Sequence, residues 1–201
     1  MNVFTYYEPL HSTHIEVINV WADSWRKHGW TPIVIGENQF RLNYDWREYD
    51  AVVSKFPTVN DTRYDRACFR RWKAMSLIGG LMTDYDVANR GFTPEMLPTS
   101  DNLKILSKHH VPCLVWGTPS QYLAACSKFL QYQIRSDDLF EGKPLVEDMT
   151  ILQKVQPCEW FDTISRCDVW NDPGWDTFPM VHCSSCSCGN RKLEIMRELT
   201  K

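Results

Sequence analysis

The sequence predicts an α/β fold in which a mixed, mostly parallel central sheet is flanked by helices, within a single domain spanning residues 1–201. Three observations favour this fold. The chain opens with a strand, a helix and a second strand, the order that produces parallel strands joined by a crossover helix. Further along, a helix ends at two glycines and leads into another short apolar strand. No internal repeat or low-complexity linker divides the chain, so one domain is expected.

The opening unit consists of residues 2–6, 12–28 and 31–35. The first segment is an apolar strand. Ser12 is a candidate N-cap for the helix that follows, whose apolar residues recur at the spacing of one broad helical face. The third segment is a second strand that ends at Gly36. The next apolar stretch, residues 50–56, is compatible with a third strand or with a helix end.

The middle of the chain contains a helix over residues 65–78, which Gly79 and Gly80 terminate. Residues 81–83 then form a short apolar strand that leads into Asp84. A double glycine also permits close approach of the backbone to a neighbour.

The second half predicts shorter elements, and Pro at the first helical position marks one of the helix starts. They are short strands at 105–106 and 113–116, a helix from Pro119 to 131, a polar loop at 135–144, a helix from 146–148 through 155, an irregular region at 158–179, a last strand at 181–182 and an amphipathic helix at 191–199.

Composition narrows the class of protein. Of the 201 residues, 43% are hydrophobic and 13% aromatic, which is sufficient for one sizeable core. The net charge of -3 gives no basic field for nucleic acid, so no nucleic-acid partner is expected. No apolar run is long enough for a transmembrane helix, and the amino terminus does not resemble a signal peptide. We therefore expect a soluble, cytoplasmic protein, compatible with being one domain of a longer chain.

Cysteine usage agrees with a reducing compartment. The chain has eight cysteines, and without a signal peptide reduced thiols that pack as small core residues are the favoured interpretation. The segment His182-Cys183-x2-Cys186-x-Cys188 also resembles a zinc-binding cluster. It lacks the second, distant pair of ligands that zinc fingers have.

Asp84 and Asp86 are the strongest candidates for chemistry. In an extended segment, residues i and i+2 point to the same side, so two carboxylates at this spacing repel unless a positive group lies between them. A divalent cation with oxygen ligands fits that requirement. The apolar strand before Asp84 would deliver both carboxylates to a strand end, where open α/β sheets bind ligands.

Arg71 precedes this pair on the predicted helix. It shares a helical face with Ala74, Met75 and Ile78, which are apolar. Arg71 is therefore expected on the buried face of the helix, at its amino-terminal end. A cation in that position could meet a phosphate or a carboxylate.

The pattern Arg71-x3-Met75-x3-Gly79-Gly80-x3-Asp84-x-Asp86 resembles the sugar-binding region of glycosyltransferases with the Rossmann-like GT-A fold. It is most similar to the Asp-x-Asp family that includes the initiation-specific mannosyltransferases. The close match covers about seventeen residues. Met75 stands where that family usually has Leu, and Thr83 precedes Asp84 where an apolar residue is common.

The resemblance implies a metal-dependent glycosyltransferase of the hexosyltransferase type. Its partners would be a nucleotide-sugar donor, with a UDP-sugar favoured over a GDP-sugar, and a glycan or glycoconjugate acceptor. It also implies Mn²⁺, or Mg²⁺, which stabilises the departing diphosphate. The same resemblance implies that Asp86 is a direct metal ligand and that Asp84 binds metal, ribose or both. It also implies that His182 near the carboxyl terminus is the third protein ligand.

Glu147 and Asp148 are candidates for catalysis. They lie at a predicted helix start, where the macrodipole favours carboxylates, and this alone explains them structurally. The resemblance implies a catalytic carboxylate in this part of the chain, which in inverting enzymes deprotonates the acceptor hydroxyl. The pair favours the inverting pattern with Asp148 as the base.

Further candidates would bind the donor and the acceptor. Aromatic rings at the end of the first strand could stack on a nucleobase, and indoles could pack against a sugar. The donor candidates are Thr5, Tyr6, Tyr7, Asn60, Asp61, Arg71, Asp84 and Tyr85, and the acceptor candidates are Trp116, Trp170 and Trp175.

The sequence is compatible with two other functions. A phosphohydrolase of the haloacid dehalogenase type also carries Asp-x-Asp after an apolar strand, and its nucleophile here would be Asp84. In this chain the second Asp is followed by Val-Ala-Asn and not by Gly-Thr. A non-enzymatic carbohydrate- or zinc-binding module is the other alternative, which the tryptophans and the cysteine cluster favour.

Overall fold

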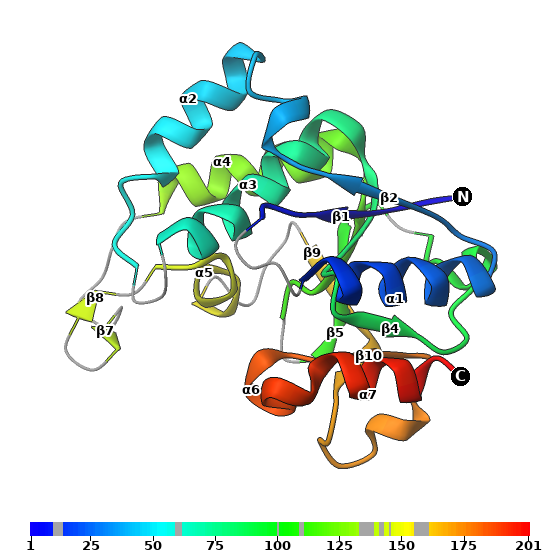
Figure 1. Ribbon diagram of the computed structural model, residues 1–201. Coiled ribbons are helices and arrows are strands. Elements are labelled where there is room, and N and C mark those ends of the chain that lie inside the picture. Colours follow the sequence, from blue (N-terminus) through cyan, green and yellow to red (C-terminus); the bar gives the residue numbers. More distant parts are fainter. Residues whose placement is uncertain are drawn as a thin grey trace.

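The computed structural model describes residues 1–9, 14–58, 62–99, 101–108, 111–132, 139–140, 143–144, 146–154 and 161–201. Within them an eight-stranded sheet lies between two layers of helices (Figure 1). The α/β class that the sequence predicts is therefore confirmed.

The strand order of the main sheet is β2-β1-β3-β6-β5-β9-β10-β4, and a separate pair is formed by β7 and β8. The bounds of the strands are β1 (Asn2–Tyr6), β2 (Thr31–Ile35), β3 (Gly80–Thr83), β4 (Val87–Asn89), β5 (Leu103–Ser107), β6 (Leu114–Gly117), β7 (Leu139–Phe140), β8 (Lys143–Pro144), β9 (Phe161–Val169) and β10 (Met180–His182).

The α-helices are α1 (His14–Lys27), α2 (Tyr44–Val53), α3 (Thr62–Ile78), α4 (Pro119–Gln131), α5 (Asp148–Lys154), α6 (Ser185–Cys188) and α7 (Lys192–Leu199). Short 3₁₀ turns occur at η1 (Glu37–Gln39), η2 (Pro94–Met96), η4 (Trp175–Thr177) and η5 (Gly189–Arg191).

The sheet is mixed, so the prediction of a mostly parallel sheet is wrong. Four strand pairings are parallel and three are antiparallel. The β5–β6 and β3–β6 pairs are antiparallel, as is the β4–β10 pair at one edge. The short connection from β5 to β6 explains the first reversal, because a parallel partner requires a crossover of about a dozen residues or more.

The sheet also curls. β3 and β4 are five positions apart in the strand order, which in a flat sheet would separate them by about 24 Å. Only residues 84–86 connect the two strands, and four residue steps span at most about 14 Å. The sheet therefore bends round until β4 returns towards the end of β3, and residues 84–86 bridge the two.

Two hydrophobic cores fill the space between the layers. The helices α2, α3, α4 and α5 contribute to one core, and α1 and α7 contribute to the other (Figure 1). Neighbouring residues of β1 and β3 alternate between them: Val3 and Leu81 lie in the second core, and Phe4 and Met82 in the first. This alternation follows from the two-residue period of a strand.

The junction between α3 and β3 explains the two glycines. Gly79 and Gly80 have φ angles of 72° and 101°, which residues other than glycine rarely adopt. A Cβ atom on Gly79 would also lie 2.5 Å from the ring of Pro119. The chain can therefore turn directly from the helix into the central strand β3, which aims the following residues at the edge of the sheet.

The opening unit, the helix before Gly79 and the helix from Pro119 occur where the sequence predicts them. Residues 50–53 belong to α2, whose first turn is capped by Asn43, so the helical alternative for residues 50–56 is the better one. Ser12 lies outside the described residues, as do 135–138 and 141–142 of the predicted loop. The loop prediction is wrong for residues 139–140 and 143–144, which pair as the antiparallel strands β7 and β8.

The expectation of an irregular region at 158–179 is wrong, because β9 spans Phe161–Val169. Several side chains of β9 face solvent and are polar, so the apolar pattern of a strand is weak in the sequence. Among the helices of the described ranges, none has the length and apolar character needed to cross a membrane.

Candidate functional site

The candidate metal ligands lie together at one end of the strands of the main sheet. β3 and β10 end there and β4 begins there, since His182 of β10 pairs with Val87 of β4. Asp84 follows β3 and Asp86 precedes β4. The topology therefore brings together three side chains that are separated by up to 98 positions in the sequence.

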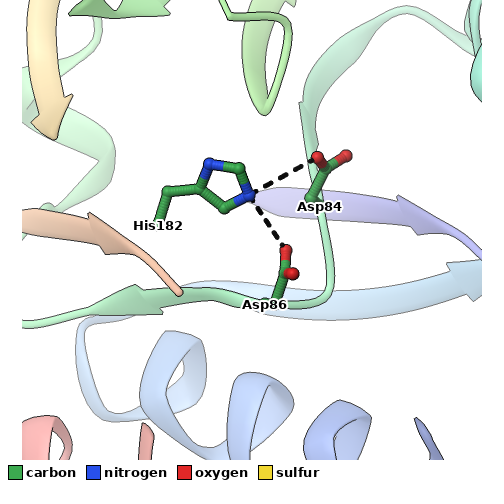
Figure 2. Close-up of side chains that lie close together, drawn as sticks. All are labelled: Asp84, Asp86 and His182. Atoms are coloured by element: carbon green, nitrogen blue, oxygen red, sulfur yellow. Dashed lines mark ion pairs between the residues drawn. The ribbon is translucent and has the colours of Figure 1, made fainter. Parts of the chain in front are cut away.

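Asp84, Asp86 and His182 form a compact cluster (Figure 2). His182 Nε2 lies 3.4 Å from Asp86 Oδ1 and 4.0 Å from Asp84 Oδ2. One ligand atom from each residue lies within 4.8 Å of the others. The Asp84 side chain is 26% exposed and the other two are 11% exposed, so the cluster is sheltered but open on the Asp84 side.

The backbone around the cluster forms a turn and not the extended segment that the sequence predicts. The N–H of Val87 donates to the carbonyl of Asp84 at 3.1 Å. The N–H of Asp84 donates to the carbonyl of Cys113, and the N–H of Cys183 donates to the carbonyl of Asp86. Both aspartates are thus held by backbone bonds to residues that adjoin β6 and β10, and the turn still directs both carboxylates at His182.

Arg71 joins the cluster to a third carboxylate. Its guanidinium pairs with Asp84 and also with Asp148, where Nη2 lies 2.6 Å and Nε 3.2 Å from Oδ2. Trp72 donates its indole N–H to the same Asp148 oxygen at 2.8 Å. Arg71 and Asp148 are both buried. The expectation that Arg71 lies on the buried face of its helix is confirmed, and of the two expected partners, a phosphate or a carboxylate, the structure shows carboxylates.

The neighbouring charges alter the pKa values of the cluster. Burial raises the pKa of Asp84 to about 6, while Arg71 opposes this shift and Asp86 adds to it. Burial would also raise the pKa of Asp86, but the charges and hydrogen bonds of His182 and Lys192 hold it well below the ordinary value. Burial lowers the pKa of His182, yet the Cys113 sulfur and the Asp86 carboxylate raise it above its usual value. A cation that bound here would therefore compete with protons on His182 and Asp84.

Lys192 is a cation of this site that the sequence does not predict. It is the first residue of α7, and its ammonium lies 2.5 Å from Asp86 Oδ2. It also donates to Ser185 Oγ at 3.1 Å. No spacing pattern in the sequence indicates this contact, because the two residues are 106 positions apart.

The donor set fits a divalent metal ion. Two carboxylates and one imidazole combine hard oxygen ligands with a nitrogen ligand, a set that can hold a divalent cation. Their mutual distances permit all three to reach one ion. Within the described ranges, this is the one group of three or more His, Cys, Asp or Glu side chains close enough to do so.

The cysteine cluster does not support the zinc alternative. Cys183 and Cys188 are buried and Cys186 is exposed. Over the described part of the chain, no group with metal-ligand spacing contains these thiols. His182 turns instead towards the two aspartates (Figure 2).

The donor candidates from the amino terminus divide into core and rim. Thr5 is fully buried, and Tyr6 is buried with its hydroxyl donating to Glu8 at 2.6 Å. Tyr7 is half-buried, and its ring packs edge-on against Tyr85 with centroids 5.8 Å apart. Tyr7 and Tyr85 therefore flank the site, whereas Thr5 and Tyr6 lie in the interior. Asn60 and Asp61 lie outside the described residues.

The acceptor candidates are not all close to the cluster. The N–H of Trp170 donates to the carbonyl of His182 at 3.0 Å, which places Trp170 at the edge that carries the site. Its ring lies 6.3 Å from that of Trp175. Trp116 pairs with Leu81 in the sheet, two positions from the Thr83 end, so it lies back from this edge.

Glu147 and Asp148 stand in different environments. Asp148 is buried, and it accepts hydrogen bonds from Arg71 and Trp72. Glu147 is half-buried, and burial together with the charge of Asp148 raises its pKa to about 7. A carboxyl group with a pKa near neutrality suits proton transfer better than one that is held in an ion pair.

Comparisons of the chain with models of protein families, with curated proteins and with solved structures found no significant match.

Proposed function

We propose that the protein is a metal-dependent glycosyltransferase that moves a sugar from a nucleotide-sugar donor to a hydroxyl of a glycan or glycoconjugate. The observation that carries this proposal is the convergence of Asp84, Asp86 and His182 on one point at the edge of the sheet. The resemblance of residues 71–86 to the sugar-binding region of GT-A enzymes supplies the reaction class. A UDP-sugar is the favoured donor and a GDP-sugar is the second choice.

The α/β sheet supports the GT-A assignment through the place of the site. The candidate ligands lie beyond the carboxyl ends of β3 and β10, the position that ligands occupy in open α/β sheets. Tyr7, which follows the parallel strand β1, lies at the same edge and offers a ring for the nucleobase.

Asp84, Asp86 and His182 would hold the cation, with Mn²⁺ favoured over Mg²⁺. When bound, such an ion supplies charge stabilisation to a departing diphosphate. Arg71 fixes the direction of the Asp84 carboxylate, because it is itself held by Asp148. These residues thus orient the donor end of the site before any substrate arrives.

Glu147 is the better choice of base within the Glu147–Asp148 pair. The base of an inverting transfer accepts the proton of the acceptor hydroxyl, and this requires a carboxylate with a free oxygen and a pKa near the working pH. Asp148 uses one oxygen for Arg71 and Trp72, and its other oxygen accepts from the N–H of Met149 at 2.8 Å. We therefore assign proton transfer to Glu147 and the positioning of Arg71 to Asp148.

A thermal-shift screen tests the proposal. The protein is incubated with UDP-sugars and GDP-sugars, each with and without Mn²⁺. A ligand that binds the native state at 100-fold over its Kd adds about 2.7 kcal/mol of stability. We expect stabilisation by one donor class only when Mn²⁺ is present. If no donor shifts the melting temperature under either condition, the proposal is wrong.

Product analysis distinguishes this function from that of a phosphohydrolase whose nucleophile is Asp84. A glycosyltransferase transfers the sugar to the acceptor or to water. It releases a nucleoside diphosphate and no free phosphate. Release of inorganic phosphate from a phosphate ester would favour the phosphohydrolase. Metal-independent binding of a glycan without turnover would favour the non-enzymatic module.

A further inference from the structure

Lys192 pairs with Asp86, one of the three candidate metal ligands. Its ammonium lies 2.5 Å from Asp86 Oδ2, while His182 Nε2 lies 3.4 Å from Asp86 Oδ1. The protein therefore already places a positive charge on one of its candidate metal ligands. Any cation that approached this carboxylate would meet the ammonium there.

The charges of the site show why Lys192 is the group that can change partners. Three carboxylates are present, those of Asp84, Asp86 and Asp148. Arg71 is buried and bonded to two of them. The Lys192 side chain is 16% exposed and bonds to one carboxylate and to Ser185. A lysine ammonium on a flexible four-carbon stem can move to a new acceptor without moving the backbone.

The helix that carries Lys192 is held independently of this ion pair. Ile195 and Met196 of α7 are buried in the core that α1 shares. Arg197 pairs with Glu16 of α1 at 3.0 Å. Figure 1 shows α7 lying alongside α1. The loss of the Lys192 contact should therefore leave the helix in place.

We propose that Lys192 exchanges partners during donor binding: it holds Asp86 when no divalent cation is bound, yields that carboxylate to the cation, and then binds a phosphate of the donor. The inference rests on the proposed function, since it assumes a donor with a diphosphate. Lys192 is thus a positioning residue that balances charge in the empty site and adds a phosphate contact in the loaded one.

A purely structural ion pair predicts something different. If Lys192 served only to tie α7 to the turn before β4, its replacement would lower the melting temperature and leave cation and phosphate affinities unchanged. Binding measurements separate the two roles.

The experiment compares Lys192→Met, which keeps the stem and removes the charge, with wild type. Arg191→Met is the matched control, because Arg191 is the neighbouring cation and is exposed in a pair with Glu194. Calorimetry gives the Kd of Mn²⁺ alone, and then the Kd of UDP and of uridine at saturating Mn²⁺. A second series uses GDP and guanosine.

We expect Lys192→Met to bind Mn²⁺ about five-fold more tightly, because a competing cation is gone. Its UDP or GDP affinity should fall about ten-fold, while its affinity for the nucleoside stays unchanged. Lys192→Arg should recover most of the diphosphate affinity, and Arg191→Met should behave as wild type.

Unchanged Mn²⁺ affinity or unchanged diphosphate affinity in Lys192→Met would overturn the exchange, provided that wild type binds both ligands. A wild-type protein that takes up no Mn²⁺, or that binds Mn²⁺ but no nucleoside diphosphate, would overturn the proposed function as well.

Discussion

Arg71 Nη2 lies 2.6 Å from Asp148 Oδ2, and this buried contact joins α3 to α5 across 77 positions of the chain. The same guanidinium pairs with Asp84. Arg71 is thus shared between a carboxylate of the candidate metal centre and the buried carboxylate of Asp148. Arg71 therefore contributes both to the candidate metal centre and to the contact between α3 and α5.

The first prediction concerns stability. Arg71→Met should lower the free energy of unfolding by about 3 to 5 kcal/mol, because it leaves the charge of Asp148 buried without a partner. Urea denaturation measures this loss. Removing the charge of Asp148 as well, in Arg71→Met/Asp148→Asn, should restore part of it.

Arg26→Met provides the control for that measurement. Arg26 pairs with Asp23 at the surface, where the two side chains are 59% and 78% exposed, so the loss should be less than about 1 kcal/mol. Equal losses for Arg26→Met and Arg71→Met would contradict the buried-pair argument.

The second prediction concerns metal binding. Asp86→Asn should abolish the stabilisation by Mn²⁺, because it removes the carboxylate between His182 and Lys192 while keeping the size of the side chain. The melting temperature with and without Mn²⁺ measures the effect. Asp23→Asn, at an exposed aspartate outside the cluster, should keep the full shift. A full Mn²⁺ shift in Asp86→Asn would mean that the metal ligands lie elsewhere.

The third prediction is a pH dependence of metal affinity. Metal ligation requires a neutral imidazole and an ionised carboxylate. The pKa of His182 lies above its ordinary value and that of Asp84 is about 6, so both groups carry a competing proton in mildly acidic solution. The affinity for Mn²⁺ should therefore rise with pH through about 6 and continue to rise above the ordinary His value of about 6.5.

Calorimetric titrations with Mn²⁺ across this range would show the trend. His182→Gln should bind more weakly and with a shallower slope, since one of the two competing protons is absent. An affinity that does not vary with pH would argue against ligation by His182.

The fourth prediction concerns the base. Glu147 has a pKa of about 7, raised by burial and then by Asp148. A base must be ionised, so kcat/KM for transfer should rise with pH up to about 7 and then level off. Glu147→Gln should remove this rise and lower the plateau by about 10²-fold or more.

Asp148→Asn is the comparison for Glu147→Gln. It should reduce stability through the loss of the Arg71 pair and retain an ascending pH limb. If the limb disappears in Asp148→Asn and persists in Glu147→Gln, the two roles are reversed.

The local sequence determined the elements whose signals lie within a few residues. Gly79 and Gly80 end a helix because their positive φ angles require it. Thr118 caps α4 by accepting from the N–H of Gln121, and Pro119 fits its first turn. The apolar strand that precedes Asp84 marks Asp84 and Asp86 as candidate ligands. These features depend on bonds between near neighbours, so the residue types alone reveal them.

Only the tertiary structure decided which distant groups meet. β9 is a strand because β5 and β10 pair with it, although its polar side chains hide the pattern. The curl of the sheet brings β4 back towards β3, and this makes His182 a neighbour of the aspartates. Lys192 reaches Asp86 from 106 positions away, and Asp148 is engaged by Arg71. Contacts between segments far apart in sequence depend on the whole fold, so no local pattern indicates those of Lys192 and Asp148. For His182, the resemblance of residues 71–86 implies the role of third ligand, and the fold supplies the contact.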